Sequence, residues 1–280
     1  MKIDTHVHLT PPHIISGWQA LGAKEPYFRL LSESPVNQFA DAKRVLAMMD
    51  LEGIDWAVVF GFAFQDPGLC QAVNDYTIAQ VKAAPDRLIG FAVVNPLDPK
   101  TGAELIRCFE AGLRGVGELF PEGQGFSLQD PKAMGRIVEP CLAYDFPLLI
   151  HMNEPVGHPY PGKTSTSLAD VEKLVDLFPE LTLILAHWGG GLLFYELMPE
   201  LRRKFSRVYY DTAASVFLYR HEVYEVAKAI GIFPKILFGS DYPLLPPSRY
   251  EKQIGRASLS SEDLQGLWGS HAAQVLGLIS

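Results

Sequence analysis

The sequence has few cysteines and no long apolar run. Its three cysteines, Cys70, Cys108 and Cys141, stand far apart, and no Cys-x-x-Cys pair occurs among its 280 residues. This excludes a disulfide framework and a cysteine-based zinc site, so we expect buried free thiols. No apolar run approaches the roughly 18 residues of a membrane-spanning helix, and MKIDTHVHLT lacks the apolar stretch of a signal peptide. We therefore expect a cytoplasmic protein with no membrane partner.

Basic residues are also in a minority. The 24 Lys and Arg residues face 32 Asp and Glu residues, which gives a net charge of −8. A broad nucleic-acid surface would need a basic stripe, so a nucleic-acid partner is not expected. At about 150 residues per domain the length suggests two domains, but α/β barrels reach roughly 250 residues as one. We expect one domain over residues 1–280 and a small-molecule substrate, and the sequence leaves open whether the chain forms a homo-oligomer.

Short apolar segments alternate with helical patterns along the whole chain. Most of these segments are continuously apolar, which is typical of parallel strands covered on both faces. The eight expected strands are Lys2–His8, Ile54–Phe60, Leu88–Val94, Leu113–Leu119, Phe146–His151, Thr182–His187, Arg207–Asp211 and Ile236–Asp241. The expected helices are Asp41–Glu52, Cys70–Ala84, Lys100–Ala111, Lys132–Ala143, Ser167–Phe178, Leu192–Lys204, His221–Ala229 and Leu259–Leu276.

This alternation predicts an α/β protein with parallel strands. A count of eight favours a closed (β/α)8 TIM barrel over an open doubly wound sheet, and no Gly-x-Gly-x-x-Gly follows the first strand. Two connections, Thr10–Ala40 after strand one and Met152–Thr166 after strand five, are longer than the others. Both leave the carboxyl ends of their strands, where barrels build active sites, so we expect long loops at the mouth.

Polar side chains with metal-ligand chemistry end five of the eight strands. They are His6, His8, Glu118, His151, His187 and Asp241. Closing the barrel would aim all of them into one mouth. Imidazole and carboxylate ligands suit a divalent ion, most simply zinc, with manganese, iron or cobalt as alternatives. The absence of cysteine ligands argues for a catalytic rather than a structural site.

Several of these segments together resemble a known family. The segments are DTHVH (4–8), LLIH (148–151), LAHWGGG (185–191), ILFGSDYP (236–243) and GSHAAQVLGL (269–278). They are similar to the amidohydrolase superfamily, and closest to the amidohydrolase-related branch that includes aminocarboxymuconate semialdehyde decarboxylase. The resemblance implies a metal-dependent (β/α)8 enzyme and spans the whole chain.

The resemblance also implies roles for individual residues. In a one-metal site, His6, His8, His151 and Asp241 would be ligands. The catalytic residues would then be His187, which orients or deprotonates a water, and Asp241, which accepts a proton. In a two-metal site, Glu118 would bridge an ion on His6, His8 and Asp241 to another on His151 and His187. The resemblance is compatible with both arrangements.

Substrate contacts are expected from the mouth loops. His158, Tyr160 and Lys163 follow strand five, Arg29 lies in the first long connection, and Trp188 follows His187 directly. Lys163 or Arg29 could pair a substrate anion, but a solvated Lys163 and a structural or solvated Arg29 are favoured, and Trp188 could equally belong to the core. Asp211 ends strand seven without an assigned partner.

Two reactions fit these residues. The first expectation is hydrolysis of a small amide, lactone or ester by metal-activated water. The alternative is nonoxidative decarboxylation of an unsaturated or aromatic acid, in which His187 or Asp241 supplies the proton that replaces CO₂. A barrel that only binds a ligand is disfavoured, because every expected ligand position is filled.

Overall fold

The computed structural model describes residues 1–279, and eight short parallel strands form its centre. Strands β1 to β3 pair in chain order, and so do β4 to β8. All the paired strands are parallel, which confirms the predicted α/β class. The strands are β1 (Ile3–His8), β2 (Trp56–Phe60), β3 (Leu88–Gly90), β4 (Val116–Leu119), β5 (Leu148–Ile150), β6 (Leu183–Leu185), β7 (Val208–Asp211) and β8 (Ile236–Leu237).

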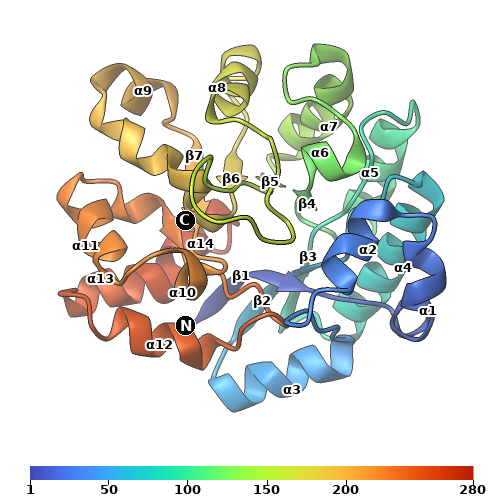
Figure 1. Cartoon of the computed structure of the whole chain (residues 1–280), viewed down its shortest axis with the longest axis horizontal. Helices are drawn as coiled ribbons and strands as arrows, with labels where there is room; N and C mark the ends of the chain where they lie inside the picture. The colour runs from blue at the N-terminus through green and yellow to red at the C-terminus, as the bar shows by residue number, and fades with distance from the viewer. Residues whose placement is uncertain (280) are drawn as a thin grey trace.

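Backbone hydrogen bonds at two seams close the ring. The amides of Thr5 and His8 donate to the carbonyls of Phe238 and Tyr242, so β1 lies beside the end of β8. At the other seam, Ala92 after β3 donates to the carbonyl of Gly115, just before β4, and accepts from the amide of Gly117 within β4. The predicted (β/α)8 barrel is confirmed, with helices arranged around the central strands (Figure 1).

Most of the predicted helices are present, and several start where the sequence places a cap. The Asp41 and Asp66 carboxylates and the Ser167 hydroxyl accept the backbone N–H groups that each helix start leaves free. The helices are α1 (Pro12–Gly22), α2 (Pro26–Ser32), α3 (Ala42–Glu52), α4 (Pro67–Ala83), α5 (Thr101–Glu110), α6 (Pro121–Gln124), α7 (Pro131–Tyr144), α8 (Leu168–Leu177), α9 (Pro199–Lys204), α10 (Ser215–Leu218), α11 (Glu222–Ala229), α12 (Pro247–Ile254), α13 (Ser261–Gln265) and α14 (His271–Val275).

Two predicted helices are interrupted. The helix expected over Leu192–Lys204 is instead a 3-10 segment, His187–Leu197, followed by α9, which begins at Pro199. The helix expected over Leu259–Leu276 contains a π-helical turn, Gly266–Ser270, between α13 and α14. A Cβ atom on Gly269 would lie 2.4 Å from the Met1 carbonyl oxygen. The turn therefore passes close against the start of the chain.

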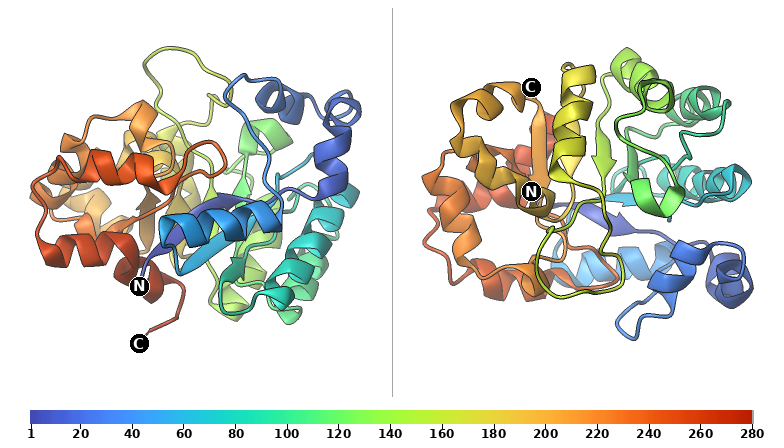
Figure 2. Two further views of the ribbon diagram at one scale, coloured as in Figure 1. Left: turned by 90° about the horizontal axis from the view of Figure 1, so that it is seen from below. Right: turned by 45° about the horizontal axis from the view of Figure 1, so that its top comes forward.

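The connection after β1 is more ordered than the predicted loop. It contains α1 and α2, each of which begins at a proline in the first helical turn, where the missing N–H costs nothing. The connection after β5 is irregular, as predicted, and arches over the barrel centre. Figure 2 (left) shows α1, α2 and the β5 connection at one end of the barrel, opposite both termini.

The buried apolar side chains form one continuous core of strand and helix residues, and the three cysteines, on α4, α5 and α7, are free and buried in it, as expected. Among residues 1–279 no helix combines the length and hydropathy that crossing a membrane requires.

Candidate metal centre and active site

The barrel brings all six predicted metal ligands together. They form two groups of three, and within each group the candidate ligand atoms all lie within 4.8 Å of one another. His6 and His8 come from β1 and Asp241 follows β8, while Glu118 lies on β4 and His151 and His187 follow β5 and β6. The groups are His6, His8 and Asp241, and Glu118, His151 and His187.

The first group gathers nitrogen and carboxylate oxygen at the seam between β1 and β8. His8 Nε2 lies 3.1 Å from Asp241 Oδ1, and His6 Nε2 lies 3.6 Å from the same oxygen. His6 Nδ1 lies 2.8 Å from the Asp211 carboxylate. An Nδ1–H donated to that carboxylate leaves Nε2 with a lone pair, and this buried Nε2 has no hydrogen-bond partner.

The second group is held by two backbone carbonyls. His151 Nε2 lies 2.9 Å from Gly162 O, and His187 Nδ1 lies 2.9 Å from Ala213 O. Because carbonyls only accept, these ring nitrogens carry the hydrogens. The opposite nitrogens, His151 Nδ1 and His187 Nε2, face each other at 3.2 Å.

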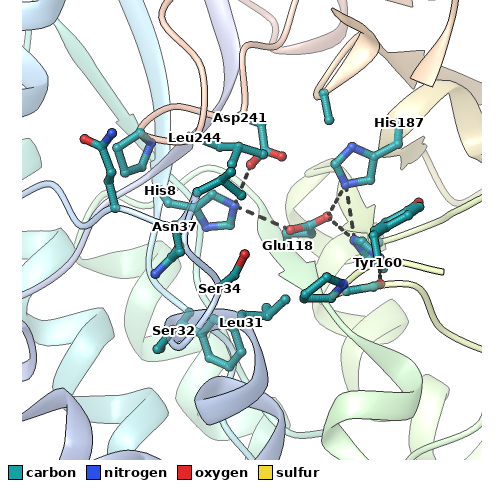
Figure 3. A pocket seen from close by; sticks show the side chains of 18 of the residues that line it. His8, Leu31, Ser32, Ser34, Asn37, Glu118, Tyr160, His187, Asp241 and Leu244 are labelled. Carbon is teal, nitrogen blue, oxygen red and sulfur yellow. Dashed lines mark hydrogen bonds and ion pairs between the residues drawn. The ribbon is translucent and has the colours of Figure 1, made fainter. Parts of the chain in front are cut away.

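Glu118 lies between the two groups, as Figure 3 shows. Its Oε1 is 3.1 Å from His151 Nδ1 and 3.5 Å from His187 Nε2. Its Oε2 is 3.5 Å from His6 Nε2 and 3.8 Å from His8 Nε2. The backbone can place Glu118 here because residue 117 is a glycine. Its φ of +121° favours glycine, and a Cβ there would lie 2.2 Å from the Leu149 carbonyl oxygen.

Asp211 supports the site from behind, a role that the sequence did not predict. One of its oxygens faces His6 Nδ1, and the other accepts the backbone N–H groups of His187 and Ala213. It is fully buried. The sequence signal was its position at the end of β7, level with the other polar strand ends, but no motif indicated what it contacts.

Asp4 links the two strands of the first group. Its carboxylate accepts the N–H of His6, and the N–H and hydroxyl of Ser240, which precedes Asp241. Burial raises the pKa of Asp4 to about 7, although these hydrogen bonds oppose the shift. Asp4 thus fixes the ends of β1 and β8 relative to each other.

Charge and burial compete throughout the cluster. Burial by itself would lower the pKa of His6, but the Asp211 and Glu118 carboxylates outweigh it and raise that pKa well above the usual value. Burial would raise the pKa of Glu118, but the surrounding imidazoles hold it well below the usual value. In the same way, Glu118 and Asp241 raise the pKa of His187 to about 9 against the effect of burial.

The donor set fits a divalent cation. In the first group, His6 Nε2 has no hydrogen-bond partner, and carboxylate oxygens of Glu118 and Asp241 converge on it. Such a convergence of acceptors in a buried space needs a positive charge. Imidazole and carboxylate together suit zinc, manganese, iron or cobalt.

A cavity of about 570 Å³ opens above the cluster, and five of the six residues line it. Only His6 lies entirely beneath the surface. Two of the predicted substrate contacts, His158 and Tyr160, also line this cavity. Tyr160 lies 3.4 Å from the Glu154 carboxylate, within the same loop.

The other three predicted substrate contacts do not line the cavity and have other partners. Lys163 Nζ donates to backbone carbonyls of its own loop, including those of Gly157 and His158. Trp188 is fully buried, and its indole N–H donates to the Ser215 hydroxyl. Arg29 is exposed and pairs with Glu33 one helical turn later.

A (β/α)8 barrel with imidazoles and carboxylates gathered at the carboxyl ends of its strands has the architecture of a metal-dependent barrel enzyme. Residues 3–278 match the profile of the amidohydrolase family, and the chain belongs to that family. The resemblance inferred from the sequence is therefore confirmed.

Three solved structures are similar over nearly all of the chain. One is 5-carboxyvanillate decarboxylase from Sphingomonas paucimobilis, with 18% identity, a TM-score of 0.78 and coverage of 99% of this chain and 98% of that one. The second is the Novosphingobium aromaticivorans 5-carboxyvanillate decarboxylase, crystallised with manganese and a nitrobenzoic acid (17% identity, TM-score 0.77, coverage 99% and 96%). The third is a dihydroxybenzoic acid decarboxylase from Polaromonas, with manganese and 2-nitroresorcinol (19% identity, TM-score 0.73, coverage 99% and 97%).

These neighbours overturn the first expectation about the reaction. All three are decarboxylases of aromatic acids, so the prediction of a hydrolase is wrong and its alternative agrees better with them. The physical reason is that one set of imidazoles and carboxylates serves both reactions. The strand-end residues therefore indicate a metal without specifying which bond breaks.

Proposed function

We propose that the chain is a metal-dependent, nonoxidative decarboxylase of an aromatic or unsaturated carboxylic acid. The observation that carries this proposal is an apolar cavity whose floor consists of imidazoles and carboxylates. Aromatic side chains, among them Phe62 and Phe120, line its walls, and Phe120 stacks on the His151 ring at 4.5 Å. Such walls favour conversion of an anionic carboxylate into neutral CO₂, because the product carries no charge to solvate.

His6, His8 and Asp241, together with Glu118 Oε2, would hold a divalent ion in this proposal. When bound, the ion supplies positive charge that holds and neutralises the oxygens of the acid. Manganese and zinc are the first ions to test. The support for this position is the unpartnered, buried Nε2 of His6.

We assign the proton transfer to His187. Its Nδ1–H is donated to Ala213 O, so Nε2 is the atom free to take and release a proton beside Glu118 Oε1. The bond between the carboxyl group and its carbon breaks, and the electron pair stays on that carbon. A proton from His187 Nε2 then forms the new C–H bond as CO₂ leaves. Glu118 and His151 position this proton in place of a second ion.

The proposal is tested with a panel of small acids. Protein loaded with manganese or zinc is mixed with 2-hydroxybenzoate, 2,6-dihydroxybenzoate and an unsaturated aliphatic acid, and evolved CO₂ is trapped and counted. We expect CO₂ from at least one aromatic acid, and none after chelation. A matched panel of lactones and anilides is the control, and cleavage there without CO₂ from any acid contradicts the proposal.

Metal analysis tests the ligand assignment independently. We expect about one ion per chain in fully loaded protein, because the second group then holds a proton. Two ions per chain would mean that Glu118 bridges them, and would contradict the proton-transfer role given to His187.

A further inference from the structure

The charges around the cavity are confined to its floor. The floor carries Glu118 and Asp241 with three imidazoles, whereas the walls come largely from apolar side chains such as Phe28, Leu31 and Leu244. Among the described residues that line the cavity, none is a lysine or an arginine. Beyond the floor, the only ionisable side chains in the lining are His158 and Tyr160, on the β5 connection.

Three cations near the cavity in sequence already have hydrogen-bond or ion-pair partners. Arg29, beside Phe28, pairs with Glu33 on the exposed side of α2. Arg44 donates to the Phe39 carbonyl at 2.6 Å and to the Gln38 side chain. Lys163 is held by the carbonyls of its own loop. None of these three side chains lines the cavity.

A ligand with a second carboxylate therefore meets an unfavourable environment. The first carboxylate would lie at the floor, near the proposed ion. The second would lose its water against apolar walls without gaining a lysine or arginine partner. Burying a charge without a partner is costly, so a second carboxylate should weaken binding.

Neutral polar groups are available at the far wall instead. Figure 3 shows Leu31, Ser32 and Ser34 on the opposite side of Glu118 from Asp241. The Ser32 hydroxyl is buried and has no hydrogen-bond partner in the described structure. A hydroxyl, methoxy or ester group on a bound ligand would satisfy it without introducing charge.

We propose that this cavity selects acids with a single ionised carboxylate and an uncharged body, and discriminates against a second carboxylate on that body. The inference rests on the proposed function for the orientation of the acid, with its carboxylate at the floor. The far wall then acts as a neutral subsite formed by the end of α2 and the residues that follow it.

A matched set of three ligands isolates charge from size. The set is 2-hydroxybenzoate, the same acid with a second carboxylate at carbon 5, and the methyl ester of that second carboxylate. Dissociation constants are measured by calorimetry on manganese-loaded protein carrying His187→Gln, so that turnover does not consume the ligands, while CO₂ is counted separately with the unsubstituted protein. We expect the ester to bind within about threefold of the parent acid, and the diacid at least about tenfold more weakly than the ester.

A cation placed in the wall should reverse the preference. In the same background, Ser34→Lys should tighten diacid binding about tenfold and leave the parent acid within about threefold. Ser34→Met is the control of similar length without charge, and should not tighten diacid binding. Three results would overturn the inference. They are equal binding of diacid and ester, a gain of diacid affinity with Ser34→Met, and no binding of any of the three ligands.

The two proposals fail in different ways. If the charge preference holds but no acid releases CO₂, decarboxylation is wrong and the selectivity stands. If CO₂ is released but the diacid binds as tightly as the ester, the selectivity is wrong and the reaction stands.

Discussion

At the scale of single residues, His187 carries the proposed chemistry. Its Nδ1 is committed to Ala213 O, which leaves Nε2 facing Glu118 and the cavity. Removing the group that delivers the proton should cost about 10²–10⁴ in turnover. His187→Gln is therefore expected to abolish most CO₂ release while the metal content stays unchanged.

The control for this substitution is His221→Gln. His221 lies beside Glu222 at the start of α11 and does not line the cavity. Its turnover should match that of the unsubstituted protein. If His187→Gln retains full activity, or loses its metal together with its activity, the proton-transfer assignment fails.

Asp211 acts through the residues it orients rather than on substrate. Replacing its carboxylate with an amide weakens the acceptor for His6 Nδ1 and the backbone support of His187. Loss of such a partner behind a ligand typically costs 10–100-fold in metal affinity. Asp211→Asn should therefore raise the metal Kd by about that factor, measured by competition with a chelating dye.

Asp176→Asn provides the surface comparison, because Asp176 pairs with Lys204, away from the site. Its metal Kd should not change. An unchanged Kd for Asp211→Asn would mean that Asp211 has no influence on the metal ligands.

At the scale of elements, the turn after β6 places His187. Residues 187–191 all have positive φ, and Gly190, at +59°, packs so closely on the β5 connection that a Cβ would lie 2.3 Å from Asn153 O. Gly190→Ala should therefore disturb both the turn after β6 and the connection after β5. It should lower the free energy of unfolding by more than backbone strain alone would.

Gly53→Ala makes the matched comparison. Gly53 ends α3 at a similar φ of +66°, but nothing lies within 4 Å of its would-be Cβ. This substitution should cost about 1–2 kcal/mol of unfolding free energy, from the left-handed backbone alone. Urea unfolding should show a clearly larger loss for Gly190→Ala, and equal losses would contradict the packing argument.

The sequence predicted the elements well where a local signal was strong. Apolar runs located all eight strands, and the predicted ranges that begin at Asp41 and Ser167 start at the residues that cap α3 and α8. The first connection was predicted as a long loop, but its Pro12 and Pro26 begin α1 and α2, since a proline at a helix start is compatible with the helix. The short helices α6, α10 and α12 were not predicted, and two of them are only four residues long.

The candidate site was predictable only in part. Five strand ends carried ligand-type residues, and a barrel brings strand ends together. Residue spacing does not encode side-chain directions. It therefore could not predict what Asp211 contacts, or that the nearby lysine and arginine side chains do not line the cavity. The reaction was not predictable, since the same residues serve hydrolysis and decarboxylation.

At the scale of the whole molecule, the proposed ion should stabilise the fold. The six ligand-type residues come from five of the eight strands. An ion held there would connect the β1–β3 part of the barrel to the β4–β8 part. A ligand that binds only the folded state at a hundred times its Kd contributes about 2.7 kcal/mol. Chelation should therefore lower the Tm by roughly 5 °C or more.

Adding back manganese or zinc should restore the original Tm, and adding magnesium should not, because magnesium prefers oxygen ligands. The measurement is a thermal scan of the chelated and the reloaded protein. A Tm that is the same in both states would contradict a metal within this cluster.

The most direct test of the central claim follows the carboxyl carbon and the incoming proton together. Metal-loaded protein is given the best acid of the panel, labelled with ¹³C in its carboxyl group, in heavy water. The proposed reaction predicts one ¹³CO₂ for each acid consumed and one deuterium at the carbon that lost the carboxyl group, both abolished by chelation. Label that stays in the organic product, or a product without deuterium at that carbon, would contradict it.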